Sequence, residues 1–200
     1  MFAYVKKMQY LCAQYKQIAC FMKRLTGIII TLLFAVSAFC AEPVRIDRLN
    51  YNLNETTRTA EVAYTPGTSG SISIPSSVEY KGVRYRVTNI ESGAFGECEN
   101  LLSVVIPEGI TKINDYVFVQ CYRLSSVTIP KSVTEIGAWA FNFCNGLTSV
   151  SLPEDVVHIG EGAFSGCTNL QFIAIPHQAS IDRDAFWGCE NIRVSFYDNN

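Results

Sequence analysis

The chain has 200 residues, of which 48% are hydrophobic, and a formal net charge of −2 at pH 7. From residue 41 onward it carries eleven Lys and Arg against eighteen Asp and Glu, a net charge of −7. This balance argues against a nucleic-acid-binding protein, because such binding depends on Lys and Arg that neutralise phosphates.

The first predicted element is a leader that ends near residue 40. Met22-Lys23-Arg24 is a short basic start, and an apolar run follows from Leu25 to Phe39. This order is typical of a secretory signal peptide. The run is shorter than the roughly 20 residues of a membrane-spanning helix, so we expect no membrane span in the mature chain. Residues 1–40 are therefore predicted to be a leader, with Met22 as the initiator and the signal peptide at about residues 22–40.

Residues 41–89 are predicted to form an N-terminal β cap. Apolar and polar residues alternate here, turn-forming residues from Thr65 to Gly70 separate the runs, and Val78–Val87 suits a hairpin that turns at Lys81-Gly82. Such period-two patterns are typical of strands. A cap is needed because the first unit of the repeats that follow would otherwise expose its core and strand edges.

A repeat of about 23 residues fills residues 90–200. Its markers are a Phe followed three residues later by Cys, and an Ile-Pro or Leu-Pro pair. The Phe and Cys positions are Phe95, Phe118, Phe141, Phe164 and Phe186, and Cys98, Cys121, Cys144, Cys167 and Cys189. Such a period indicates a solenoid, because each unit can bury its apolar face only against its neighbours.

Each repeat is expected to form one strand, one turn and one short helical or 3₁₀ segment. Val127 and Ile129 are predicted to face inward, and Pro130 ends the strand because proline cannot donate to a ladder. Phe141 and Cys144 suit a single helical turn. The predicted fold class is α/β and strand-rich, a solenoid of about five 23-residue coils behind the β cap, with an atypical last coil as a C-terminal cap.

The combined markers resemble the BspA-like branch of leucine-rich repeats. Ser132–Pro153 matches the unit sVtxIgxxAFxxCxxLxxvxIP almost throughout, and Ser73–Val78 with Tyr85–Ile90 is similar to that family's entry segment. The resemblance covers residues 43–196. It implies a leucine-rich-repeat solenoid in a secreted or cell-surface protein, and several family members are adhesins for host matrix proteins. It implies no catalytic residues.

The cysteine ladder is interpreted as buried free thiols. Coils about 4.8 Å apart would allow disulfides, but equivalent side chains in a stack point in parallel. Structural zinc needs thiolates or imidazoles gathered in a tetrahedron, which a single ladder does not supply, so we expect no metal. His158 and His177 occupy slots that hold either charge in other repeats, and we expect them to be solvated and unpaired.

Two surfaces are candidates for binding a partner. The first is the outward side of the predicted strands, where small hydroxyl and apolar side chains form a flat lattice. Its residues are Ser103, Val105, Ser126, Thr128, Ser149, Ser151, Phe172 and Ala174. The second is an aromatic patch of Tyr116, Tyr122, Trp139 and Phe143. These aromatic residues either form an exposed interface or pack against neighbouring turns.

These features predict an exported interaction module, secreted or at the cell surface, that binds a protein partner non-covalently, such as a host matrix or cell-surface protein. Two alternatives remain open: a carbohydrate-binding module that uses Tyr116 and Trp139, and a structural repeat stalk without a specific ligand. An enzyme is not expected, because the sequence has neither a G-x-S-x-G nor a P-loop motif. No cofactor is expected.

Export can be tested at the N-terminus of the native protein. Because cleavage requires small residues after the apolar run, we expect N-terminal sequencing to begin between Phe39 and Glu42. A mature protein that still carries residues 1–21 would contradict the predicted leader.

Overall fold

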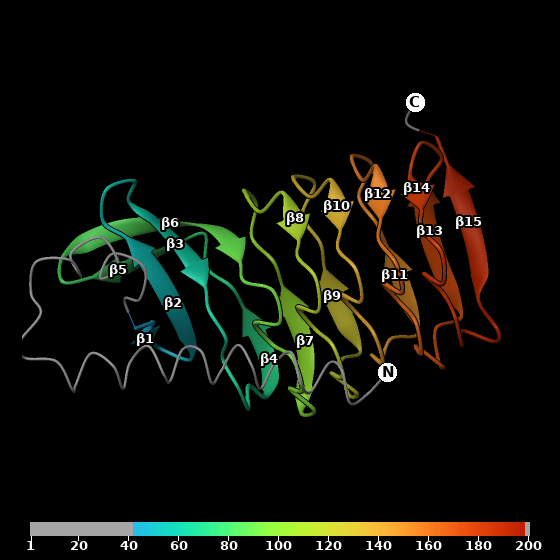
Figure 1. The fold of residues 1–200 in the computed structure, drawn as a ribbon, viewed down its shortest axis with the longest axis horizontal. Helices are drawn as coiled ribbons and strands as arrows, with labels where there is room; N and C mark the ends of the chain where they lie inside the picture. Colours follow the sequence, from blue (N-terminus) through green and yellow to red (C-terminus); the bar gives the residue numbers. More distant parts are fainter. Residues whose placement is uncertain (1–41, 199–200) are drawn as a thin grey trace, which may run out of the picture. The chain divides into compact units, whose positions relative to one another are not determined.

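The computed structural model describes residues 42–198, and the predicted leader lies outside the described residues. This part of the chain consists of strands and turns, which follow one another from β1 to β15 (Figure 1). No helix in residues 42–198 is long and apolar enough to cross a membrane.

The first sheet is formed by the segment predicted as a β cap. Its strands lie in the order β1 (Val44–Ile46), β2 (Leu49–Asn54), β3 (Thr59–Val62), β6 (Val83–Ile90) and β5 (Ser77–Tyr80). The predicted turn at Lys81-Gly82 is confirmed, and both residues have positive φ, 51° and 74°. Two-residue hairpins favour such angles because their twist matches that of the strands.

The repeats form a solenoid, as predicted, with parallel strands on two sides. One side consists of β4 (Gly70–Ser73), β7 (Leu101–Val105) and β9 (Ser126–Thr128), then β11 (Ser149–Ser151), β13 (Phe172–Pro176) and β15 (Arg193–Tyr197). The other consists of β8 (Lys112–Ile113), β10 (Glu135–Ile136), β12 (His158–Ile159) and β14 (Ser180–Ile181). Since β4 already pairs with β7 in this stack, the solenoid has about six turns, one more than the sequence suggested.

The helical segment expected in each repeat is a series of tight turns instead. The amides of Asn142 and Cys144 donate to the carbonyls three residues earlier, both at 3.2 Å. Trp139 and Phe143 both have a φ of 57°. A right-handed helix requires negative φ throughout, so two left-handed residues four positions apart limit the chain to single turns. The described part of the molecule is therefore a β-solenoid without helices.

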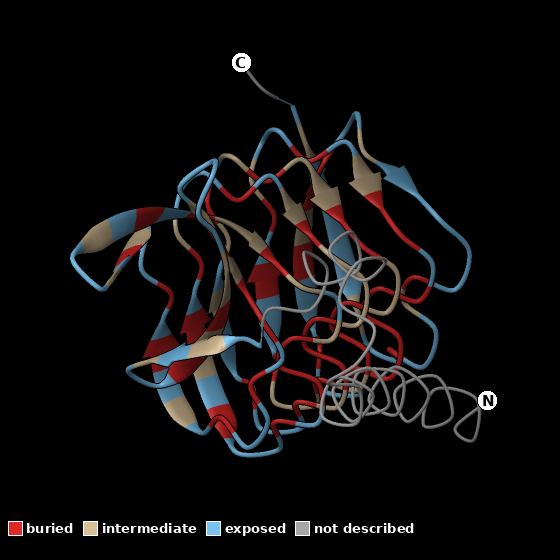
Figure 2. Cartoon of the chain, turned by 60° about the vertical axis from the view of Figure 1, so that its left-hand side comes forward, coloured by how far each residue is buried: buried red, intermediate tan, exposed pale blue. Residues whose placement is uncertain are grey.

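The phenylalanine ladder is the centre of the core. The rings of Phe95, Phe118, Phe141, Phe164 and Phe186 stack with centroids 5.2 to 5.7 Å apart. The first four are fully buried, and Figure 2 shows buried residues recurring from coil to coil. Offset stacking of such rings adds about 0.5–1.5 kcal/mol per pair to the free energy of burial. The core therefore depends on contacts between coils.

Backbone hydrogen bonds also run between coils. The amide of Tyr116 donates to the carbonyl of Ala138 at 3.0 Å, and the amide of Phe118 donates to the carbonyl of Ala140 at 2.8 Å. Buried amides need such partners, and here the partner belongs to the next coil. Alternate turn amides of each coil thus depend on carbonyls of its neighbour.

Candidate functional site

The first predicted surface occupies the outward side of the strands. Its eight residues lie on β7, β9, β11 and β13, and we call it the strand face: Ser103, Val105, Ser126, Thr128, Ser149, Ser151, Phe172 and Ala174. The strand register brings equivalent positions together, pairing Ser103 with Ser126 and Ser149 with Phe172. Val105 and Phe172 are each 43% exposed, whereas Ser103 and Ala174 are partly buried.

The strand face spans two sheets. β9 ends one three-stranded sheet and β11 begins the other, with no strand pairing between them. Thr128 and Ser151 are exposed on either side of this boundary. A partner that covers both sheets must therefore cross the line between these two residues.

Charged residues border the strand face but do not enter it. Beyond the strand ends, Lys131 Nζ lies 3.3 Å from Glu154 Oε1, and the amide of Lys131 donates to Glu108 Oε1 at 3.3 Å. An uncharged centre with a polar rim is the usual anatomy of a protein interface. In a chain whose net charge is −7 from residue 41 onward, the uncharged strip is a distinct surface.

The aromatic patch is largely packed against neighbouring turns. Tyr116, Trp139 and Phe143 are partly buried, and Tyr122 is 38% exposed. A Cβ atom added to Gly162 would lie 2.6 Å from the Trp139 ring. Gly162 also has a φ of +60°. Glycine is therefore needed both for the backbone conformation and for the close approach of the indole.

The cysteines of the ladder are free and buried, as predicted. Each thiol has a backbone partner in the preceding coil: Cys144 Sγ donates to the carbonyl of Phe118 and Cys167 Sγ to that of Phe141, both at 3.1 Å. Burial raises the pKa of the Cys144 thiol well above its ordinary value. The thiols are thus neutral donors inside the stack, a role that the sequence did not predict.

Both histidines lie near carboxylates, so the expectation of unpaired histidines was wrong. His158 Nε2 lies 3.5 Å from Asp182 Oδ2, and His158 Nδ1 lies 3.0 Å from Ser180 Oγ. His177 Nδ1 lies 3.2 Å from Asp198 Oδ1. These partners belong to the next coil, where a comparison of the histidine slots alone does not find them. Within residues 42–198, no three metal-ligating side chains gather at one place.

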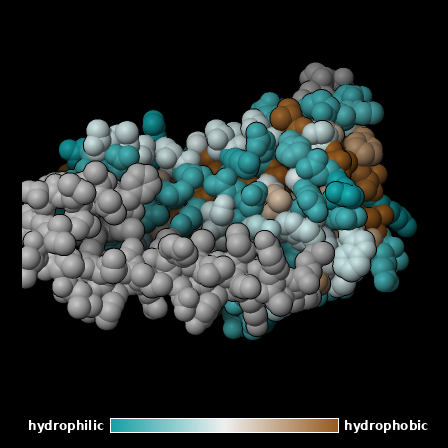
Figure 3. Space-filling model, in the orientation of Figure 1, coloured by the Kyte–Doolittle hydropathy of each residue, from teal (hydrophilic) through white to brown (hydrophobic). Residues whose placement is uncertain are grey.

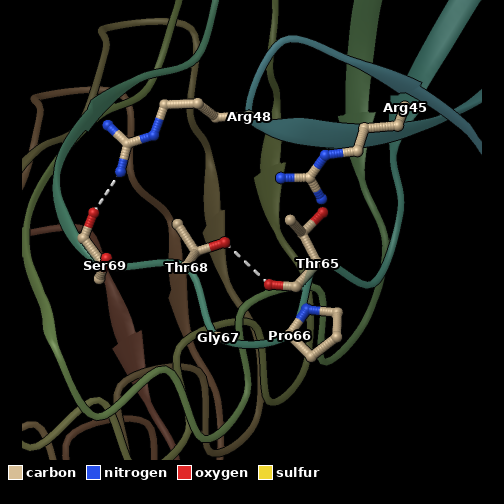
Figure 4. A pocket seen from close by; sticks show the side chains of 7 residues that line it. All are labelled: Arg45, Arg48, Thr65, Pro66, Gly67, Thr68 and Ser69. Carbon is tan, nitrogen blue, oxygen red and sulfur yellow. Dashed lines mark hydrogen bonds between the residues drawn. The ribbon is translucent and has the colours of Figure 1, made fainter.

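A small cavity lies between the β1–β2 hairpin and the loop at residues 65–69. Its volume is about 160 Å³, and its side chains are shown in Figure 4. Arg48 donates to the carbonyls of Ser69 and Ser71, and Thr68 Oγ1 donates to the carbonyl of Thr65 at 2.8 Å. The Arg48 bonds hold this segment against the hairpin, and the Thr68 bond lies within the loop. Among the residues that the structure describes, no carboxylate, thiol or imidazole lines the cavity.

The last coil carries exposed apolar side chains that the sequence did not predict. We call this group the open end: Ile181, Trp187, Val194 and Phe196. All four are exposed, Trp187 by 66% and Phe196 by 49%. The sequence does contain a signal for this group: the slots of the last coil can be compared with the equivalent slots of the earlier repeats.

The repeat geometry agrees with a match to a known family. A model of the BspA type leucine-rich repeat region matches residues 70–193 in six copies. The chain belongs to the BspA-type leucine-rich repeat family. The match begins at β4, in agreement with the extra turn of this BspA-type solenoid.

Solved structures share the fold. A leucine-rich repeat protein from Bacteroides ovatus is 31% identical, with a TM-score of 0.70 over 77% of this chain and 41% of that one. The T. pallidum leucine-rich repeat protein is 23% identical, with a TM-score of 0.66 over 76% of this chain and 71% of that one. The pneumococcal vaccine antigen PcpA is 18% identical, with a TM-score of 0.60 over 79% and 37%. No match is found among curated proteins.

The buried thiols predict how the stability of this BspA-type solenoid depends on pH. Unfolded cysteines lose their protons near pH 9, whereas the folded thiols retain them because their pKa is raised. The unfolded state then binds fewer protons, so the stabilisation is complete below about pH 9 and is lost as the pH rises further. We expect Cys144→Ala to reduce this loss by up to about 1.4 kcal/mol per pH unit.

Urea unfolding of both proteins between pH 8 and 10.5 measures this difference. The substitution also removes a buried group, so Cys144→Ala is expected to be less stable at pH 7 by about 1–2 kcal/mol. Equal slopes against pH would show that Cys144 does not retain its proton in the folded state.

Proposed function

We propose that the chain is an exported interaction module that binds a protein partner non-covalently through the strand face, at the cell surface or after secretion. The observation that carries the proposal is the uncharged, largely exposed strip across four parallel strands of an otherwise acidic protein. The predicted leader and the usual location of the BspA-type family support export. Because several members of the family are adhesins for host matrix proteins, the proposed partner is a host matrix or cell-surface protein.

The chemistry of the strand face suits a protein more than a sugar. Small hydroxyl side chains such as Ser126 and Ser149 let another backbone approach closely, and the exposed ring of Phe172 offers an apolar anchor. Buried aromatic anchors contribute a large share of the binding free energy in protein interfaces. A sugar platform would need open aromatic faces, but the indole of Trp139 lies against Gly162. Binding by this face requires no reaction and no cofactor.

The proposal can be tested with two double variants that add the same charge to opposite sides of the stack. Thr128→Arg with Ser151→Arg places two long cations at the middle of the strand face. Thr111→Arg with Val157→Arg places them at exposed positions beside β8 and β12. Binding to immobilised extracellular-matrix proteins, assayed one at a time, is then measured for both. We expect the strand-face variant to lose at least about tenfold in affinity, because a desolvated unpaired charge costs several kcal/mol, and the control to bind normally.

The alternatives predict different outcomes for the same proteins. If binding survives the strand-face variant but is lost in Tyr122→Ser, the aromatic patch is the site and glycans become the preferred ligands. If the unmodified protein binds neither matrix proteins nor a glycan array, the interpretation as a structural stalk is favoured. Circular dichroism of each variant confirms that the fold is retained.

A further inference from the structure

The open end consists of slots that are buried elsewhere in the stack. Ile181 is equivalent to Ile113, Ile136 and Ile159, which are fully buried. Val194 is equivalent to Ile173 and Phe196 to Ile175, and both of these are also fully buried. A solvated end of a solenoid is expected to have a polar outer face. Here the slots remain apolar although no coil within the described residues covers them.

The apolar side chains of the open end gather at one side of the molecule. In Figure 3 hydrophobic surface is concentrated at the right, where Figure 1 places β13, β14 and β15. Exposed apolar surface of this kind, bordered by polar residues, marks a surface that another molecule covers.

The backbone of β15 has an unpaired edge. The amide of Arg193 donates to the carbonyl of Gln171, and the carbonyl of Tyr197 accepts from the amide of His177, both at 2.9 Å. The backbone amides and carbonyls of the odd-numbered residues of β15 therefore point toward β13. Along a strand the backbone groups alternate in direction. The amides and carbonyls of Val194 and Phe196 therefore point to the opposite side, where no strand of residues 42–198 pairs with them.

We propose that the open end binds a second copy of the chain, with the two β15 strands antiparallel about a two-fold axis at Ser195. This register pairs Val194 of each copy with Phe196 of the other, and it uses the outward backbone groups of both residues. Such facing pairs exchange two hydrogen bonds each. An axis at Val194 would place Val194 opposite itself, so Phe196 would no longer face Val194 of the second copy. Of the axes that place outward backbone groups opposite one another, only the axis at Ser195 pairs Val194 with Phe196 on both sides.

In that register, the side chains of one β15 strand suit those of the β15 strand of the second copy. On the apolar side, Val194 meets Phe196 of the second copy, a pairing of the kind that stabilises sheets. On the outer side, Ser195 meets its own equivalent, and Arg193 meets Tyr197 of the second copy. Arg193 is the only charged residue of β15, so no like charges face each other, and its guanidinium can lie over the tyrosine ring. Isologous two-fold contacts require this self-complementarity.

The register can be tested at Ser195, because only a two-fold axis there places the residue opposite itself. Ser195 is exposed, so Ser195→Glu and Ser195→Arg should fold normally. Light scattering during size-exclusion chromatography of the full chain should give twice the monomer mass for the unmodified protein. Each variant alone should be monomeric, because like charges directly opposite each other are destabilising. An equimolar mixture of the two should recover the dimer.

Thr128→Glu is the matched control, since it adds the same charge on an outward position of β9. It should remain dimeric. A monomeric unmodified protein would overturn the proposal, and so would a dimer that persists in both Ser195 variants or fails to form in their mixture.

Discussion

The dependence of each coil on the next is the constraint from which the rest of the structure follows. A coil of 23 residues is too small to enclose a core, and its turn amides donate to carbonyls of the following coil. Ring stacking repeats the same relation along the core, with Phe141 between Phe118 and Phe164 at 5.3 and 5.2 Å. Stability in such an array is a sum of neighbour contacts. Every inward slot must therefore hold a side chain that suits two neighbours.

This constraint acts on inward slots and leaves outward ones free to vary. Along the strand face the inward Val150 and Ile173 are apolar, whereas the outward slot next to them changes from Ser149 to Phe172. The turn side is less free, because Trp139 is accommodated only above a glycine. A binding function is therefore easier to place on the outward strand positions than on the turns.

The two ends of the stack differ in how their apolar slots are covered. At the beginning, the segment that follows β3 bonds to the next coil: the amide of Thr65 donates to the carbonyl of Ala94 at 2.8 Å, and Cys98 Sγ donates to the carbonyl of Thr65 at 3.5 Å. At the other end, the described residues supply no equivalent for β15. The proposed antiparallel pairing with a second copy would supply hydrogen-bond partners for this edge of β15.

The sequence predicted the elements that are set by periodicity. The spacing of Phe and Cys gave the stack, and alternation within the strands identified the outward residues of the strand face. It did not predict the turns, because Trp and Phe rarely adopt positive φ. The slots of Trp139 and Phe143 contain Gly162 and Gly166 in the next repeat, and those glycines indicate the left-handed backbone. The partners of His158 and His177 depend on the offset between coils, which one repeat alone does not reveal.

Urea unfolding of Phe141→Ala and Phe186→Ala, both in the Ser195→Glu background so that self-association does not contribute, tests the central claim most directly. Phe141 is fully buried between two rings, whereas Phe186 is partly buried and stacks on Phe164 alone at 5.7 Å. If stability comes from contacts between coils, Phe141→Ala should lower the free energy of unfolding by about 3–5 kcal/mol, and Phe186→Ala by about half as much. Equal losses at the two positions, or a larger loss at Phe186, would contradict this account.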